Sequence, residues 1–428
     1  MSENVTPAPR FAALQHRNFT LIWGGSIVSN VGTWMQNVAQ GWLVLQLTNS
    51  PFWLGMLGLS FAVPMIVFPL IGGAVSDRVD RIKLLTITQS GQLLSALALA
   101  ILTWTGHINI WYILAASFIN STMLAFDNPT RQALIPSLVP SRDLLNALSL
   151  NAATYNGAAL FGPALAGILL VPLGAGSLFF LNAVSYLAVI FALFAMRDVD
   201  RHGTGGRQST LADAVLSGLK YTWSNHLILG LLGLSALAAV FGRSYQSLMP
   251  IFARDIWKGG EPGYGFLLSA AGGGAMLGAL GLASIRTLKH HGAVMISSGL
   301  VFSVSVILFA LSPNLGLGIL LMFIGGLSST VFGTMIATFM QVIAPNHMRG
   351  RVMSLYTITL IGLPSLGALA SGSLAEALGG IPGAPRAVLI GGIIVGVVLL
   401  GVASLFWKRE TADISPGGND SKRPKLYG

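Results

Sequence analysis

Long apolar stretches separated by short polar breaks fill most of the chain. Four of them are long enough for two membrane-crossing helices each, because a bilayer core about 30 Å thick needs roughly 20 apolar residues per helix. They are residues 18–76, 84–126, 144–196 and 292–346. Four shorter stretches suffice for one helix each and are residues 227–253, 262–285, 352–385 and 387–407. The pattern therefore predicts an all-α membrane protein with twelve transmembrane helices.

Each of the four long stretches contains a turn signal at which a helical hairpin can reverse. The turn segments are rich in Gly, Pro, Asn and Ser, which interrupt helices. They are residues 48–51, 106–109, 172–177 and 312–314. We therefore expect eight of the twelve helices to form four hairpins.

Composition supports lipid as the main solvent of this chain. Only 9% of its 428 residues are charged, whereas soluble domains carry about 25%. The chain contains no cysteine, which excludes disulfides and metal sites built on thiolates. We expect neither a bound metal nor a cofactor.

The net charge of +10 reports the orientation of the chain rather than binding to nucleic acid. With the N-terminus in the cytoplasm, 20 of the 24 Lys and Arg residues fall in cytoplasmic segments, as the positive-inside rule requires. The polar residues before the first apolar stretch are typical of a cytosolic tail and contain no cleavable signal peptide. We predict a multi-pass protein of the bacterial inner membrane with both termini in the cytoplasm.

The longest polar interruption divides the chain into two halves that repeat each other. Their matched glycines share an offset of 205 residues: Gly73 with Gly278, Gly162 with Gly367, and Gly167 with Gly372. Parallel six-helix repeats predict two bundles related by a pseudo-two-fold axis along the membrane normal. The expected parts are an N-terminal tail, a first bundle, a linker, a second bundle and a C-terminal tail, at residues 1–17, 18–196, 197–225, 226–407 and 408–428.

The linker contains its own periodic pattern. Leu211, Val215, Leu219 and Trp223 recur every four residues. This spacing predicts a short amphipathic helix that lies on the cytoplasmic face of the membrane.

The loop after the second predicted helix combines a glycine, an acid and several bases. They are Gly73, Asp77, Arg78, Arg81 and Lys83. In this loop the chain resembles the major facilitator superfamily of transporters, whose motif has the form G-x-x-x-D-R-x-G-R-K, although Asp80 stands where the motif has its second glycine. Glycine allows two helices to approach closely, and the acid can form charge-assisted hydrogen bonds with the arginines across a bundle interface. We interpret these residues as a gate; the alternative is that the arginines only set the topology.

The fourth predicted helix ends in an acid. Asp127 closes the apolar span and Arg131 follows four residues later, the spacing of an ion pair on one helix face, although Pro129 lies between them. In related facilitators an acid here bonds the arginines of the preceding loop, so the resemblance implies a bond from Asp127 to Arg78 or Arg81. An acid at this boundary is a functional candidate, as a gate residue, a proton-coupling site or a structural partner.

The fifth predicted helix contains Gly162 and Pro163. Their segment looks like the G-x-x-x-G-P-x-x-G-G element of export-type facilitators, with Ala158 and Ala166 in place of two glycines. Proline frees a backbone carbonyl and can bend a helix. The resemblance favours export, whereas the alternative is an ordinary packing pair.

Polar side chains inside the apolar helices form the candidate substrate site. The first helix carries Asn30, Asn37 and Gln40 on one face, with Trp34 beside them. Unpaired amides facing lipid are costly, so we expect these side chains to face a watery cavity or another helix. Residues of other helices that we expect to join them are Gln89, Asn151, Tyr155, Gln341 and Tyr356.

Arg243 lies within the seventh predicted helix, with Gln246 three residues later. A guanidinium inside a membrane helix needs a partner or water. We expect Arg243 in the outer part of that helix, where it has three candidate roles. It could contact an anionic or catecholate-like substrate, pair with Glu376, or extend toward the outer lipid headgroups.

Further stretches extend the resemblance to roughly residues 10–407. They are residues 32–36, 128–136 and 349–354, and the last contains Arg349 and Arg351, which we also expect at the gate. Together they look like the branch of the superfamily that includes the bacterial enterobactin exporter and related efflux permeases. This resemblance implies a monomer that exports a drug-like compound, siderophore or metabolite by alternating access, driven by proton antiport.

Other functions remain open at this stage. The same fold could import a solute, or a chain of this kind could act as a membrane sensor or scaffold that transports nothing. An enzyme is the least favoured hypothesis, because the chain has neither the H-E-x-x-H motif of zinc proteases nor the G-x-S-x-G motif of serine hydrolases. The chain also has no phosphate-binding G-x-x-x-x-G-K-[ST] loop, so it contains no ATP-driven motor of its own.

Overall fold

The computed structural model describes residues 11–76, 78–197, 219–285 and 290–413. All regular elements in these ranges are helical. Nine helices of the described chain are long and apolar enough to cross a membrane. The candidate gate residue Asp77 lies outside the described residues, and so do Leu211 and Val215 of the predicted amphipathic helix; residues 219–224 are helical.

The first part of the chain forms six α-helices. Short 3-10 turns at Ala12–Gln15 and Ser141–Asp143 precede α1 and α6. The α-helices are α1 (Arg17–Thr48), α2 (Pro51–Val67), α3 (Pro69–Ser76), α4 (Arg81–Trp104), α5 (Ile110–Leu138) and α6 (Leu144–Ala195).

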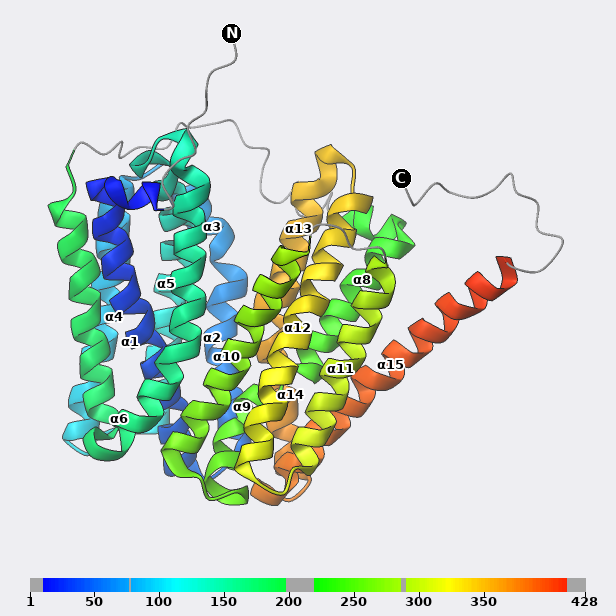
Figure 1. Cartoon of the computed structure of the whole chain (residues 1–428). Helices are drawn as coiled ribbons and strands as arrows, with labels where there is room; N and C mark the ends of the chain where they lie inside the picture. The colour runs from blue at the N-terminus through cyan, green and yellow to red at the C-terminus, as the bar shows by residue number, and fades with distance from the viewer. Residues whose placement is uncertain (1–10, 77, 198–218, 286–289, 414–428) are drawn as a thin grey trace, which may run out of the picture.

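The second part is also helical and includes two π-helical turns. Its elements are α8 (His226–Leu237), the π-turn η3 (Ala238–Gly242), α9 (Tyr245–Ile251), the π-turn η4 (Phe252–Ile256), α10 (Gly260–Ser284), α11 (His291–Leu311), α12 (Leu315–Ile343), α13 (Asn346–Ile361), α14 (Leu363–Ala377), the 3-10 turn η5 (Ile381–Gly383) and α15 (Ala384–Asp413). Helices of the first part lie on the left of Figure 1 and most of those of the second part on the right.

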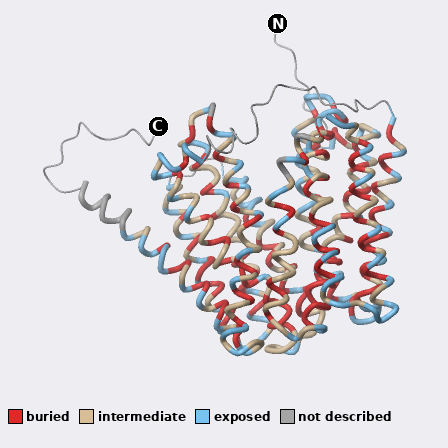
Figure 2. The backbone as a smooth tube through the Cα atoms, turned by 180° about the vertical axis from the view of Figure 1, so that it is seen from behind, coloured by how far each residue is buried: buried red, intermediate tan, exposed pale blue. Residues whose placement is uncertain are grey.

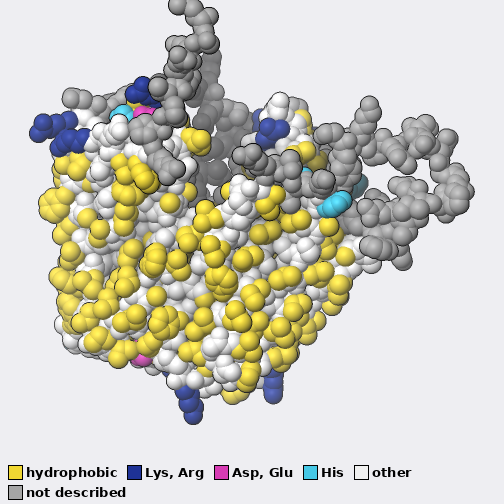
Figure 3. Space-filling model, in the orientation of Figure 1, with side chains coloured by type: hydrophobic (Ala, Val, Ile, Leu, Met, Phe, Trp, Pro, Cys, Tyr) yellow, Lys and Arg dark blue, Asp and Glu magenta, His cyan; other side chains and the backbone are white. Residues whose placement is uncertain are grey.

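The helices run between a basic end and an opposite end. The basic end, at the top of Figure 1, is where α1 begins; it carries Arg17, Arg78, Lys83, Arg142 and Arg349. Figure 3 shows hydrophobic side chains covering the wall between the two ends, with charged side chains gathered at the ends. Buried residues line the inward faces of the helices in Figure 2. This distribution is the one that a protein surrounded by lipid requires.

The structure confirms the predicted helix breaks. Helices end and begin again around residues 48–51, 106–109 and 312–314. The fourth break is a kink in α6 at Gly174, whose φ of 72° and ψ of 167° no L-residue adopts readily. Figure 1 shows α6 running to the opposite end, turning there and returning to the basic end.

Two predicted helix ends were wrong. The fourth predicted helix was expected to end at residue 126, but α5 continues to Leu138 through Pro129 and Pro136. Polar neighbours can satisfy the carbonyls that proline leaves free, so membrane helices tolerate it. The last helix was expected to end at residue 407, but α15 continues to Asp413, so part of the predicted C-terminal tail is helical.

Candidate functional site

A buried carboxylate occupies the centre of a polar cluster between α4 and α5. Asp127 is 2% exposed. Its Oδ2 accepts hydrogen bonds from Gln89 Nε2 at 2.7 Å and from Thr88 Oγ1 at 3.1 Å, and its Oδ1 accepts from Arg131 Nε at 3.0 Å. The four-residue spacing of Asp127 and Arg131 thus forms the ion pair that it predicts, with Arg131 Nη2 also 3.0 Å from Oδ1.

Arg131 extends this cluster to a third helix. Its Nη1 donates to Ser26 Oγ of α1 at 2.5 Å. Asp127 lies eleven residues before the end of α5 at Leu138, or about 16 Å at 1.5 Å per residue. The pair is therefore inside the helix bundle, deeper than the boundary position expected from the sequence.

The expected hydrogen bond from Asp127 to Arg78 or Arg81 of the preceding loop is absent among the described residues. Arg81 Nη1 instead donates to the carbonyl oxygen of Ala133 on α5 at 3.1 Å, and Arg78 is exposed. Asp80, which departs from the family motif, accepts hydrogen bonds from the backbone N–H of Ile82 and of Lys83 and so caps the start of α4.

The glycine that packs closely in this region is Gly72 rather than Gly73. A Cβ at Gly72 would lie 2.6 Å from the carbonyl oxygen of Ala125 on α5, whereas a Cβ at Gly73 would meet nothing within 4 Å. Successive helical residues point about 100° apart. The predicted close approach of two helices is therefore present, but one residue earlier than expected.

The Gly162-Pro163 element lies where α6 packs against two neighbours. On one side, a Cβ at Gly162 would lie 2.6 Å from the Cβ of Trp34 on α1. On the other, α10 approaches backbone to backbone, because a Cβ at Gly272 would lie 2.5 Å from the carbonyl oxygen of Ala159 and one at Gly265 would collide with that of Pro163. We call this contact the α6–α10 seam. It joins the first part of the chain to the second.

Arg243 is 17 residues from the first residue of its membrane segment and 13 from the last, so it lies just beyond the middle of that segment. It follows the π-turn η3, and π-turns occur frequently at functional sites. Arg243 is half-buried and lines a small pocket together with Phe302 and Phe332. Three tyrosines lie within electrostatic range of its guanidinium, namely Tyr155, Tyr245 and Tyr356.

The predicted substrate residues fall into two groups. Asn37, Tyr155 and Gln246 are exposed, and Asn30, Trp34 and Asn151 are half-buried. The others lie elsewhere or are already bonded. Gln40 is buried and Gln341 is at the basic end of α12. Gln89 bonds Asp127, and Tyr356 donates to Gly333 O at 2.6 Å. The structure thus does not bring all these residues to one surface.

Sequence reasoning missed a set of contacts at the opposite end. There Arg254 Nη1 donates to Leu45 O at 3.1 Å and Nη2 donates to Asn49 Oδ1, while Ser50 Oγ donates to Glu376 Oε2 at 2.7 Å. We call these residues the Arg254 clamp. The suggested pair of Arg243 with Glu376 is absent from the described structure. The only local signal in the sequence for these contacts was Asn49, which takes the left-handed conformation at the end of α1.

The two remaining gate candidates make contacts within their own part of the chain. Arg349 Nε donates to the carbonyl oxygen of Gln341 at 2.9 Å, and Arg351 Nη1 lies 3.6 Å from Met348 Sδ. In the ranges that the structure describes, no group of three or more His, Asp and Glu side chains could hold a metal ion.

Known proteins resemble this chain over nearly its full length. The family model described as transmembrane secretion effector matches residues 8–418. The multidrug efflux pump Tap of Mycolicibacterium fortuitum is 25% identical, over 91% of this chain and 95% of the relative. The enterobactin exporter EntS of Escherichia coli O1:K1 is 23% identical, over 90% of this chain and 91% of the relative.

A solved structure shares the fold. The nucleoside transporter NupG matches with a TM-score of 0.71 and 15% identity, over 91% of this chain and 99% of that chain. An identity this low supports the architecture alone. With the family match, it follows that the chain belongs to the transmembrane secretion effector family of the major facilitator superfamily, whose members are membrane transporters and not enzymes.

Proposed function

We propose that this chain is a secondary active exporter with twelve membrane-crossing helices, working by alternating access. The count rests on the nine candidate spans. The span Ser141–Ala195 turns at Gly174 and so supplies two crossings. Two more come from α1, with 32 residues, and from α2 together with α3.

These helices form two bundles of six, within residues 18–196 and 226–407, joined by the linker 197–225. The seams between the parts support this repeat. Gly167 approaches Gly265 across the α6–α10 seam, and Gly372 approaches Gly55 where α14 packs against α2. Since Gly167 and Gly372 are matched at the offset of 205 residues, these two contacts support a pseudo-two-fold axis.

The observation that carries the proposal is the one-sided closure of the molecule. Within the described residues, the side-chain hydrogen bonds between helices of the first part and of the second gather at the opposite end, in the Arg254 clamp. The positive-inside rule assigns the basic end to the cytoplasm. This conformation is then closed to the outside, and both termini are cytoplasmic in an inner-membrane protein of the bacterial cell.

Asp127 is the proposed site of proton coupling. Protonation removes the negative charge that holds Arg131, and charge-assisted hydrogen bonds are roughly twice as strong as neutral ones. Arg131 bonds both Asp127 and Ser26, so a change at Asp127 alters the contact between α5 and α1. The proposed gating residues are Gly73, Asp77, Arg78, Arg81, Lys83, Arg131, Gly162, Pro163, Arg349 and Arg351. Of these, Gly162 and Pro163 belong to the α6–α10 seam.

The direction and cargo follow the relatives. Tap is named as a multidrug efflux pump and EntS as an enterobactin exporter. We therefore propose that a monomer of this chain exports a drug-like compound, siderophore or metabolite.

A two-step experiment tests the proposal. A strain without the chain is first compared with its complemented parent for drug sensitivity and for metabolite secretion. The compound identified is then offered to everted membrane vesicles with an acidic interior. The native chain should accumulate it and Asp127→Asn should not, while Glu261→Gln, at the start of α10, serves as the control acid. Undiminished uptake by Asp127→Asn excludes that carboxylate, and uptake only in right-side-out vesicles indicates an importer.

A further inference from the structure

Arg243 is too deep in its helix to reach either membrane surface. Its segment runs from His226 to Ile256. Arg243 is 17 residues from the first and 13 from the second, or about 25 Å and 20 Å at 1.5 Å per residue. An arginine side chain extends only a fraction of that distance toward the headgroups. Its charge must therefore be balanced or hydrated inside the protein.

The described chain supplies no carboxylate to balance it. Arg243 takes part in none of the ion pairs found there, and its side chain has no hydrogen bond to another described residue. Asp127, an acid in the interior of the bundle, already bonds Arg131. Glu376, at the end of α14, bonds Ser50. The remaining acids whose side chains the structure describes are Asp80, Asp143, Asp255 and Glu261, at the ends of helices or in turns.

Three tyrosines lie within electrostatic range of Arg243. Tyr245 and Tyr356 come from the second part of the chain, and Tyr155 comes from α6 in the first. Tyr155 is 59% exposed. Tyr155 is therefore exposed and also within electrostatic range of Arg243, so the two parts of the chain come near one another at this point.

The pocket next to Arg243 adds further aromatic surface. Phe302 and Phe332 form part of its wall, and Tyr245 lies against Phe302 with the ring centres 6.4 Å apart. Aromatic rings favour offset or edge contacts with another ring. A guanidinium binds a carboxylate or sulfonate through two parallel hydrogen bonds. The two features select different parts of one ligand.

We infer that Arg243 is the anion-binding residue of the transport site and that the exported substrate is an organic anion with an aromatic ring. The acidic group neutralises Arg243, and the ring packs between Tyr155 and the pocket wall. Export of this anion rests on the proposed function, but binding of the anion does not depend on transport. The substrate supplies the countercharge that the protein lacks.

Binding to a matched pair of probes tests the inference. We choose 1-hydroxy-2-naphthoate, an aromatic anion, and 1-hydroxy-2-naphthamide, its neutral counterpart, and titrate each into the full-length protein in lipid nanodiscs by calorimetry. The native chain should bind the anion roughly tenfold or more tighter than the amide. Arg243→Gln should bind both equally, and Arg243→Lys should keep part of the preference because its charge remains.

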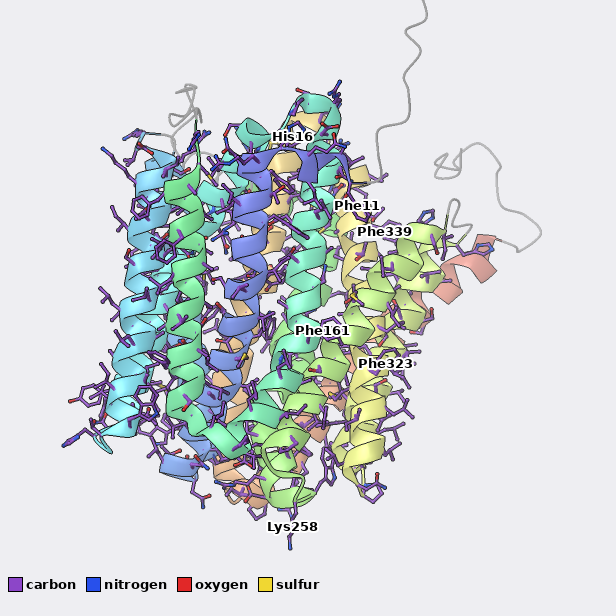
Figure 4. The ribbon with its side chains drawn as sticks, turned by 60° about the vertical axis from the view of Figure 1, so that its left-hand side comes forward. Phe11, His16, Phe161, Lys258, Phe323 and Phe339 are labelled. Carbon is purple, nitrogen blue, oxygen red and sulfur yellow. The ribbon has the colours of Figure 1, made fainter. Side chains whose placement is uncertain are left out.

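Control variants and outcomes keep this test decisive. Lys258→Gln removes an exposed base that Figure 4 shows at the opposite end of the molecule, and it should bind as the native chain does. Tyr155→Phe should weaken both probes less than Arg243→Gln weakens the anion. Equal binding of both probes by the native chain, absence of any binding, or an anion preference that survives in Arg243→Gln would each overturn the inference. An anion preference without transport in vesicles leaves the site intact and contradicts only the proposed function.

Discussion

Asp127 and Arg131 depend on one another because both are charged and buried. The side chain of Asp127 is 3% exposed and that of Arg131 is 16% exposed. Breaking a buried pair by removing one partner costs about 3–5 kcal/mol, whereas removing both charges costs much less. We expect Arg131→Leu to lower the melting temperature of the detergent-solubilised protein. The double variant Asp127→Asn/Arg131→Leu should recover most of that loss while remaining unable to transport.

Size-exclusion chromatography after heating measures the stability of these variants. Ser149→Ala, at an exposed position of α6, is a suitable control and should melt with the native chain. A double variant no more stable than Arg131→Leu would mean that Asp127 is balanced by Thr88 and Gln89 rather than by its arginine.

At this scale the sequence predicts contacts within a helix better than contacts between helices. The four-residue spacing is enough to pair Asp127 with Arg131, because the helix itself sets their distance. Ser26 and Thr88 complete the cluster from α1 and α4. Their positions follow from how the helices rotate and slide against one another, and no local pattern in the sequence reports this. Gly72 was missed for the same reason.

The α6–α10 seam depends on side chains small enough for two backbones to touch. A Cβ at Gly167 would lie 2.7 Å from the carbonyl oxygen of Glu261. Adding side-chain volume to a tightly packed contact costs about 1–3 kcal/mol. We expect Gly167→Val to lower the melting temperature and to reduce transport. Gly157→Val on the same helix has nothing within 4 Å of its Cβ and is the matched control; equal loss in both variants would assign the effect to helix propensity instead.

Helix breaks could be read from the sequence, whereas some helix ends could not. Gly, Pro and Asn at residues 48–51, 106–109 and 312–314 act through the local backbone, and helices stop there. The end of α5 was misjudged because Asp127, Arg131 and two prolines look like a boundary. In the folded chain the acid and the base neutralise one another, and Thr130 Oγ1 donates to the carbonyl oxygen of Phe126. Both contacts join residues four apart on α5, so side chains of the helix itself stabilise this region and the helix continues past its apparent end.

For the whole molecule, hydropathy and charge indicate how often the chain crosses the membrane, but not which end is closed. Both conformations of an alternating-access transporter bury the same apolar faces against lipid, so one sequence pattern fits both. The closed end is visible only in contacts between distant residues, such as Arg254 with Asn49 and Ser50 with Glu376. The charge at Arg243 and its place inside a membrane helix were evident from the sequence, whereas its lack of a counter-ion among the described residues required the structure.

A disulfide across the contact between α2 and α14 tests whether the two parts must separate at the opposite end. A Cβ at Gly58 of α2 would lie 2.9 Å from the Cβ of Ala368 of α14, and disulfides form at Cβ separations of about 3.5–4.5 Å, so a small local movement allows the bond. The chain has no cysteine of its own. Gly58→Cys/Ala368→Cys therefore adds one possible bridge. Oxidation should stop transport and a reductant should restore it. Transport by each single-cysteine variant should be unaffected by the oxidant and by the reductant. Transport that continues in fully oxidised protein, with the bridge verified by loss of maleimide labelling, would mean that this contact stays closed throughout the cycle.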